Sequence, residues 1–288
     1  MPVACLGLVG LGALSWRGPK LRGTTLVAPW VWSLVALASL AATEILIALS
    51  GSPPPEWAAQ LRFAAAVSTF CPAMALFGAK RPQNRGWQLV VLSLWAILSL
   101  PSIEWLLFGG LREIHPARCW FLAVLMAVGA ANGLGTRYWP SSLLYCGGQL
   151  ALVAPFISAQ AVQGASLARL AGMSALVLAW LLIAAELPRR RAAAWPLDRA
   201  WLDFRDGFGA VWALRVAERM NASASMYDWP LTLTWRGFVA RPSGATAGVP
   251  STVEESLRTL LRRFVSPDWI DARLGQSARD PNVITPVA

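Results

Sequence analysis

Two carboxylates and one guanidinium are the side chains of this sequence best placed to do chemistry, because they fall within long apolar stretches. Glu44 lies late in one stretch, Arg62 begins the next, and Glu104 lies late in the one after. An ionisable group inside a membrane costs at least about 2.5 to 3.5 kcal/mol on insertion scales, so it normally pairs or lines a cavity. We predict that Glu44, Arg62 and Glu104 meet at one membrane face and bind a substrate or an ion. A structural ion pair near the headgroups is the simpler alternative.

The only histidine, His115, is the single candidate for a catalytic acid or base, although a solvated loop side chain is the simpler interpretation. One histidine excludes a bis-histidine haem, a three-histidine zinc site and an HExxH metalloprotease as sites built from one chain. Nor does the sequence contain GxxxxGK[ST], or a GxGxxG between a strand and a helix, to hold nucleotide phosphates. We predict no metal and no cofactor, and we favour a protein that is not an enzyme. The four cysteines, none in CxxC spacing, are expected to be free thiols: Cys5, Cys71, Cys119 and Cys146.

Seven apolar stretches position these residues and predict an all-α fold, a polytopic transmembrane helical bundle over residues 1–188. A hydrocarbon core about 30 Å thick takes roughly 20 apolar residues to cross as a helix. Composition agrees, since 56% of the residues are hydrophobic and only 14% are charged, against about 25% charged in soluble domains. The first stretch is short for a crossing, so six spans are the alternative to seven. The predicted spans are residues 2–16, 24–50, 61–79, 87–108, 119–137, 140–158 and 167–187.

The loop charges predict a bacterial cytoplasmic (inner) membrane protein whose C-terminus is cytoplasmic. In that orientation ten Lys or Arg residues flank the spans inside and four outside, in keeping with the positive-inside rule. The net charge of +10 is then expected to meet anionic headgroups, with no nucleic acid as partner. The inner residues are Arg17, Lys20, Arg22, Lys80, Arg81, Arg85, Arg137, Arg189, Arg190 and Arg191, and the outer ones are Arg62, Arg112, Arg118 and Arg169.

The rest of the chain is predicted to form a small, mainly helical, cytoplasmic amphipathic tail domain at 189–274 and a disordered C-terminus at 275–288. Residues 198–220 carry large apolar side chains at intervals of three or four, and so does a second predicted helix at 252–265. Residues 231–239 have the composition of a strand that could pair locally. Both helices need a surface that covers their apolar faces.

These observations predict a multi-pass membrane component that is not an enzyme and that docks a partner through its tail. Side chains able to do chemistry are scarce, whereas the tail helices carry apolar stripes without an evident partner. The expected partners are the lipid bilayer and a protein that binds the helices at 198–220 and 252–265. A transporter or small-molecule channel with an outward-facing Glu/Arg site is the second interpretation. A membrane-embedded enzyme that uses His115 is the third.

Overall fold

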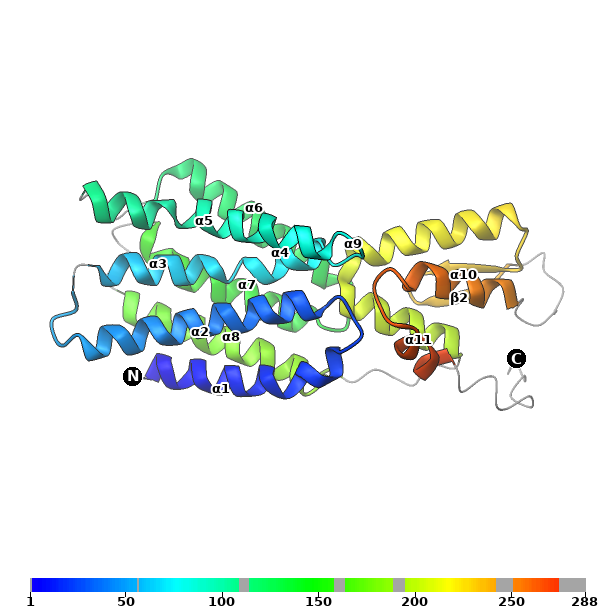
Figure 1. The fold of residues 1–288 in the computed structure, drawn as a ribbon, viewed down its shortest axis with the longest axis horizontal. Helices are drawn as coiled ribbons and strands as arrows, with labels where there is room; N and C mark the ends of the chain where they lie inside the picture. The colour runs from blue at the N-terminus through cyan, green and yellow to red at the C-terminus, as the bar shows by residue number, and fades with distance from the viewer. Residues whose placement is uncertain are drawn as a thin grey trace. The chain divides into compact units, whose positions relative to one another are not determined.

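The computed structural model describes residues 2–55, 57–108, 114–157, 164–188, 195–241 and 251–274, and most of them are helical (Figure 1). The chain forms two compact units. The bundle unit comprises Met1–Arg22, Leu26–Ala79 and Gln83–Arg189, and the tail unit comprises Gly23–Thr25, Lys80–Pro82 and Arg190–Ala288. Two short connections between bundle helices therefore belong to the tail unit.

The bundle unit confirms the all-α prediction. Among the described residues, five segments are long and apolar enough to cross a membrane: Val27–Leu49, Ala58–Phe77, Arg85–Trp105, Pro116–Leu134 and Ala165–Ala184. Two further helices match predicted spans but have only 16 and 15 residues, so each covers about 22 to 24 Å of a core about 30 Å thick. The helices are α1 (Pro2–Arg17), α2 (Val27–Leu49), α3 (Ala58–Ser68), α4 (Cys71–Phe77), α5 (Asn84–Phe108), α6 (Pro116–Leu134), α7 (Trp139–Val153) and α8 (Ala165–Ala184), with 3-10 turns η1 (Gly18–Leu21) and η2 (Ala154–Phe156).

Proline positions explain where several apolar segments break. Pro155 lies in the 3-10 turn that directly follows α7. A proline interrupts an α-helix because it has no backbone N–H for the helical ladder and its ring clashes with the preceding turn. Pro72 occupies the first turn of α4, so the candidate span Ala58–Phe77 is two helices. Pro101, by contrast, lies inside α5 without ending it.

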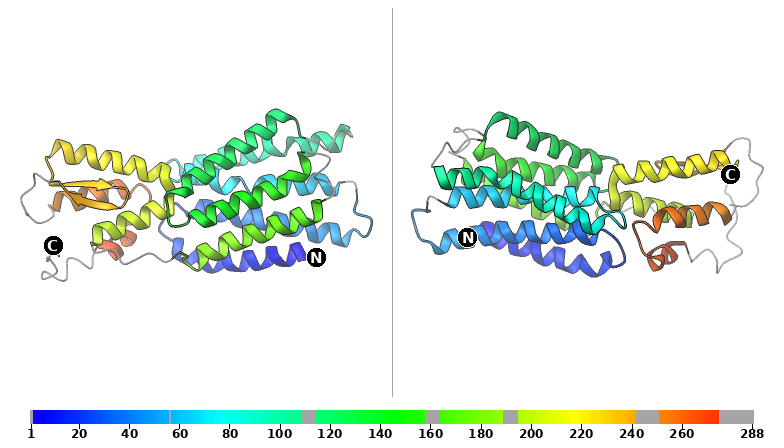
Figure 2. Two further views of the ribbon diagram at one scale, coloured as in Figure 1. Left: turned by 180° about the vertical axis from the view of Figure 1, so that it is seen from behind. Right: turned by 45° about the horizontal axis from the view of Figure 1, so that its top comes forward.

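Small residues allow α7 and α8 to pack closely; in Figure 2, α7 is green, α8 is yellow-green, and the two helices lie side by side. A Cβ at Gly148 would lie 2.9 Å from the carbonyl oxygen of Gly172, and a Cβ at Gly172 would lie 3.0 Å from that of Gly148. Neither position tolerates a larger side chain without a shift of backbone. In membranes such contacts associate helices by van der Waals packing, since lipid tails remove most of the hydrophobic driving force.

The tail unit buries the two apolar stripes against each other. It contains α9 (Pro196–Met226), β1 (Leu231–Thr234), β2 (Gly237–Ala240), α10 (Ser251–Leu261) and α11 (Pro267–Leu274). The ring of Phe264 lies 5.1 Å from that of Phe204, 5.4 Å from Phe208 and 5.0 Å from Trp212, between centroids. The two stripes, which have no evident partner in the sequence, therefore form the core of this unit.

Backbone hydrogen bonds tie the two bundle connections into the tail unit. The N–H of Thr25 donates to the carbonyl of Phe264 at 2.9 Å, and the N–H of Arg81 donates to the carbonyl of Arg263 at 2.8 Å. Thr24 forms an antiparallel bridge with Val265. Segments that the sequence marks only as loops thus complete this unit.

An antiparallel hairpin accounts for the strand composition near residue 231. Leu231 pairs with Ala240 and Thr234 with Gly237. Gly237 has φ +135°, a conformation that side chains with a Cβ rarely adopt, and a Cβ there would lie 2.5 Å from Asp198 Oδ1. That carboxylate accepts the N–H of Phe238 at 2.7 Å and holds the hairpin to α9.

Candidate functional site

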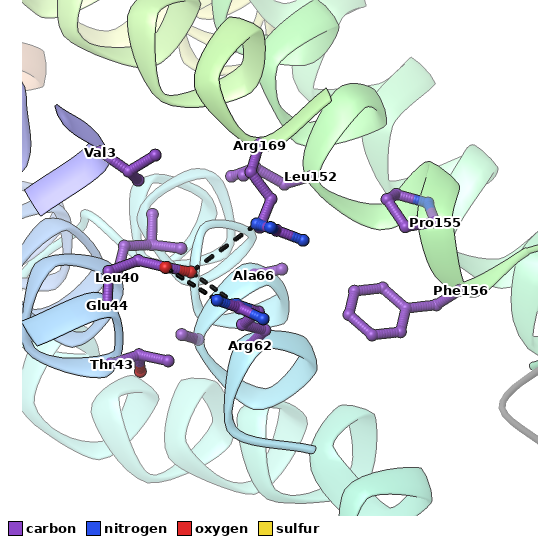
Figure 3. Close-up of a pocket in the computed structure, with 11 residues that line it drawn as sticks. Val3, Leu40, Thr43, Glu44, Arg62, Ala66, Leu152, Pro155, Phe156 and Arg169 are labelled. Atoms are coloured by element: carbon purple, nitrogen blue, oxygen red, sulfur yellow. Dashed lines mark hydrogen bonds and ion pairs between the residues drawn. The ribbon is translucent and has the colours of Figure 1, made fainter. Parts of the chain in front are cut away.

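Glu44, Arg62 and Arg169 form a charged cluster inside the bundle unit (Figure 3). Arg62 donates from Nε to Glu44 Oε1 at 2.7 Å and from Nη2 to Oε2 at 3.0 Å, a bidentate ion pair. Arg169 Nε lies 3.9 Å from Glu44 Oε1, an ion pair without a hydrogen bond. The side chains of Glu44, Arg62 and Arg169 are only 14%, 18% and 24% exposed.

Three helices bring these groups to the same level. Glu44 precedes the end of α2 by five residues, and Arg62 and Arg169 follow the starts of α3 and α8 by four. At about 1.5 Å of rise per residue, each lies about 6 to 8 Å along its helix from the helix end. Ionisable groups at that depth of a membrane-spanning bundle are expected to pair or to line a cavity.

A cavity of about 20 Å³ adjoins the cluster. Such a space holds roughly one water-sized molecule. In Figure 3 the Glu44 carboxylate faces both guanidinium groups, and the ring of Phe156 lies beyond them. The lining residues are Val3, Leu40, Thr43, Glu44, Arg62, Ala65, Ala66, Leu152, Pro155, Phe156 and Arg169.

Glu104 does not join this cluster. It accepts from Arg118 Nη1 at Oε2 and from Nη2 at Oε1, both at 2.8 Å, and the two side chains are 48% and 42% exposed. The carboxylates therefore have separate arginine partners, and the predicted meeting of Glu44, Arg62 and Glu104 is replaced by two ion pairs. The reason is that Arg118, at the start of α6, is within reach of Glu104 late in α5.

Arg169 is the cluster residue that sequence reasoning missed. Its position early in a long apolar stretch was a usable signal, because that stretch contains no other charged residue until Glu186. Glu186 itself accepts from Arg17 at 2.7 Å and from Lys20 at 3.1 Å. These hydrogen bonds lower the pKa of Glu186.

His115 has a structural role at the start of α6. It is the N-cap residue, and its Nδ1 accepts the backbone N–H of Ala117 at 3.2 Å. The neighbouring Arg112 and Glu113 lie outside the described residues. Within the described part of the chain, no group of three or more His, Cys, Asp or Glu residues could hold a metal ion.

The tail unit contains a second candidate site, a groove with a cavity volume of about 260 Å³ between α9 and α10. Trp212, Val216, Leu260 and Phe264 supply its apolar surface, and Arg215 lies over the Trp212 ring, 5.2 Å from the centroid. Charged side chains complete the lining: Lys80, Arg215, Glu218, Arg219 and Arg263. We call this site the basic groove.

Comparison of this chain with protein-family models, with curated proteins and with solved structures gave no match.

Proposed function

We propose that this protein is a multi-pass component of a bacterial inner membrane, without catalytic activity, whose cytoplasmic tail unit docks an acidic segment of a partner protein in the basic groove. The observation that carries the proposal is the composition of that groove. The groove lies between the two tail helices whose sequence suggested a docking surface, and its described lining carries more cationic than anionic side chains.

The charges of the groove favour an anionic occupant. Four cationic side chains and one carboxylate give the lining a formal charge of +3. Among the described residues, Lys80, Arg219 and Arg263 make no side-chain hydrogen bond or ion pair. Like charges around one groove repel one another and do not stabilise the fold. We therefore attribute their position to the binding of an anionic partner. A positive groove also speeds the encounter with an acidic partner.

The apolar surface and the size of the groove favour a peptide segment. A volume of about 260 Å³ is below the range of about 300 to 1,000 Å³ that small-molecule sites normally occupy. It suits one or two side chains of an extended segment, with an apolar side chain against Trp212 and Leu260 and carboxylates toward Arg219 and Arg263. Aromatic and arginine side chains are the usual energetic centres of protein interfaces.

The cytoplasmic placement rests on the loop charges, and a topology experiment tests it. Fusion of green fluorescent protein to the C-terminus should give fluorescent cells, and fusion of alkaline phosphatase should give an inactive enzyme. An active phosphatase fusion would place the tail unit outside and remove a cytoplasmic partner from consideration.

Photocrosslinking in living cells tests the docking itself. A photoreactive phenylalanine analogue at Glu218, which is exposed and lines the groove, should capture a protein whose linked peptide is rich in Asp and Glu. The adduct should decline at least tenfold in an Arg219→Glu, Arg263→Glu variant, because two contacts become repulsive. Arg262→Glu is the matched control, since Arg262 is exposed on the same segment but does not line the groove.

Three results would overturn the docking proposal. They are adducts to lipid alone, a linked peptide without acidic residues, and equal crosslinking in the charge-reversed and wild-type proteins. Expression and thermal unfolding of each variant are measured in parallel, so that loss of the adduct is assigned to the groove and not to an unfolded tail unit.

A transporter or small-molecule channel is the second candidate function, favoured by the partly buried Glu44–Arg62 pair beside a cavity. The cavity volume of about 20 Å³ admits only a water molecule or a small ion in this conformation. A transported substrate would therefore be an inorganic ion or a proton. Uptake into proteoliposomes should fall in Glu44→Gln and stay unchanged in Glu104→Gln if this function is correct.

A further inference from the structure

We propose that the cavity beside Glu44, Arg62 and Arg169 binds a small monovalent anion of halide size, held by the guanidinium groups of Arg62 and Arg169. This site lies in the bundle unit and is independent of docking at the basic groove. The described cluster has one carboxylate and two guanidinium groups, the opposite balance to the two carboxylates and one arginine predicted from the sequence.

The sign of the charge follows from the residues that line the cavity. Among these described residues there are one carboxylate and two guanidinium groups, a formal excess of one positive charge. A cation would add to that excess, whereas a single negative charge would cancel it. Interactions of this kind are strengthened by partial burial, because the effective dielectric constant there is well below that of water.

Arg169 supplies donors that no described residue accepts by a hydrogen bond. Both oxygens of Glu44 already accept from Arg62, at 2.7 and 3.0 Å, and Arg169 approaches the carboxylate only to 3.9 Å. Among the described residues the Arg169 side chain makes no hydrogen bond. A guanidinium carries five N–H donors, and this one is about three-quarters buried. Hydrogen bonds between charged groups are roughly twice as strong as those between neutral groups, and a bound anion would give the Arg169 donors a charged acceptor.

The cavity sets the size of the anion. About 20 Å³ leaves room for one small ion without its hydration shell. This space is of the order of a single monatomic ion such as a halide, whereas gluconate is far larger. Leu40, Leu152 and Phe156 form an apolar wall. Their side chains cannot hydrogen-bond to the water molecules of a hydrated ion, so the site favours an ion that is dehydrated and bound directly by the guanidinium groups.

Thermal unfolding of the full chain in detergent tests the site, read from the fluorescence of its 16 tryptophans. Sodium gluconate is replaced by sodium chloride or bromide at constant ionic strength. The midpoint should rise and then saturate, because a ligand that binds only the folded state stabilises it in proportion to occupancy. Arg169→Gln should abolish the saturable rise, and Arg118→Gln, which removes an exposed arginine of the same bundle, should retain it.

A direct measurement keeps the test decisive if a variant unfolds. The ³⁵Cl resonance of dilute chloride should broaden on addition of the wild-type protein, and bromide should reverse the broadening. Arg169→Lys, which keeps the charge but loses the fork of donors, should weaken this effect at least several-fold. Equal midpoints in gluconate and chloride, a halide effect that survives in Arg169→Gln, or displacement only by a phospholipid headgroup would each overturn the proposal.

Discussion

Neutralising Glu44 should destabilise the bundle far more than neutralising Arg169. In Glu44→Gln, two guanidinium groups lose the only carboxylate among the described residues that line their cavity. In Arg169→Gln the bidentate pair of Glu44 with Arg62 survives, and the repulsion between the two arginines is removed. Each variant removes one charge from the same cluster. The difference between their free energies of unfolding therefore shows whether loss of the negative charge or loss of a positive charge costs more.

The distances give the size of the difference. At an effective dielectric constant of about 20, unit charges attract by about 6 kcal/mol at the 2.7 Å of the Glu44–Arg62 contact and by about 4 kcal/mol at the 3.9 Å of the Glu44–Arg169 contact. Desolvation offsets much of both gains. Removing one partner of a buried pair costs about 3 to 5 kcal/mol in practice, and partial exposure places Glu44→Gln near the lower figure, about 3 kcal/mol. Arg169→Gln should cost less than about 1 kcal/mol.

Unfolding in mixed micelles with increasing dodecyl sulfate, followed by tryptophan fluorescence, measures these free energies. The measurements are made in gluconate, so that no halide contributes. Glu104→Gln is the control, because its pair with Arg118 is exposed and such pairs contribute at most about 1 kcal/mol. The reasoning is refuted if Arg169→Gln costs as much as Glu44→Gln, or if Glu44→Gln costs no more than Glu104→Gln.

Substitutions at three further positions test the packing of the two units. Gly148→Leu should disrupt the close contact of α7 with α8 at Gly172 and lower the unfolding midpoint of the bundle by several degrees. Phe264→Ala should cost the tail unit about 3 to 5 kcal/mol, measured by urea unfolding in detergent, because its ring contacts three aromatic rings of α9. Asp198→Ala should cost about 1 to 3 kcal/mol by leaving the partly buried N–H of Phe238 without its acceptor, whereas Asp198→Asn keeps one. Burial raises the pKa of Asp198, so the wild type should lose stability relative to Asp198→Asn as the pH rises from about 4 through that raised pKa, and an opposite trend would contradict this assignment.

The apolar patterns were sufficient to predict the class of fold. A span of roughly 20 apolar residues has few stable forms other than a membrane helix, because its backbone groups must bond within the segment. Residues 27–49 and 165–184 illustrate this, since both appear as single uninterrupted helices. The lengths of the two short helices α1 and α7 could not be predicted in this way. Hydropathy identifies an apolar stretch, but it does not show how many of its residues form a helix.

Which side chains meet was decided by the tertiary structure. The sequence placed Glu44, Arg62 and Glu104 at one predicted membrane face, but it carried no information on which helices are neighbours. Packing brought Arg169 of α8 to Glu44 and left Glu104 beside Arg118, and this changed the cluster from two carboxylates with one arginine to one carboxylate with two arginines. The anion site that we propose rests on that exchange.

The same distinction holds in the tail. Periodic apolar residues at 198–220 and 252–265 determined that each helix must bury one face, because exposed stripes of that size are unfavourable in water. Only the fold showed that the two faces cover each other through Phe264, and that Lys80, far away in sequence, joins Arg219 and Arg263 at one groove. Periodicity specifies which side of a helix is apolar, whereas the choice of partner depends on long-range packing, and no pattern within a single segment records it.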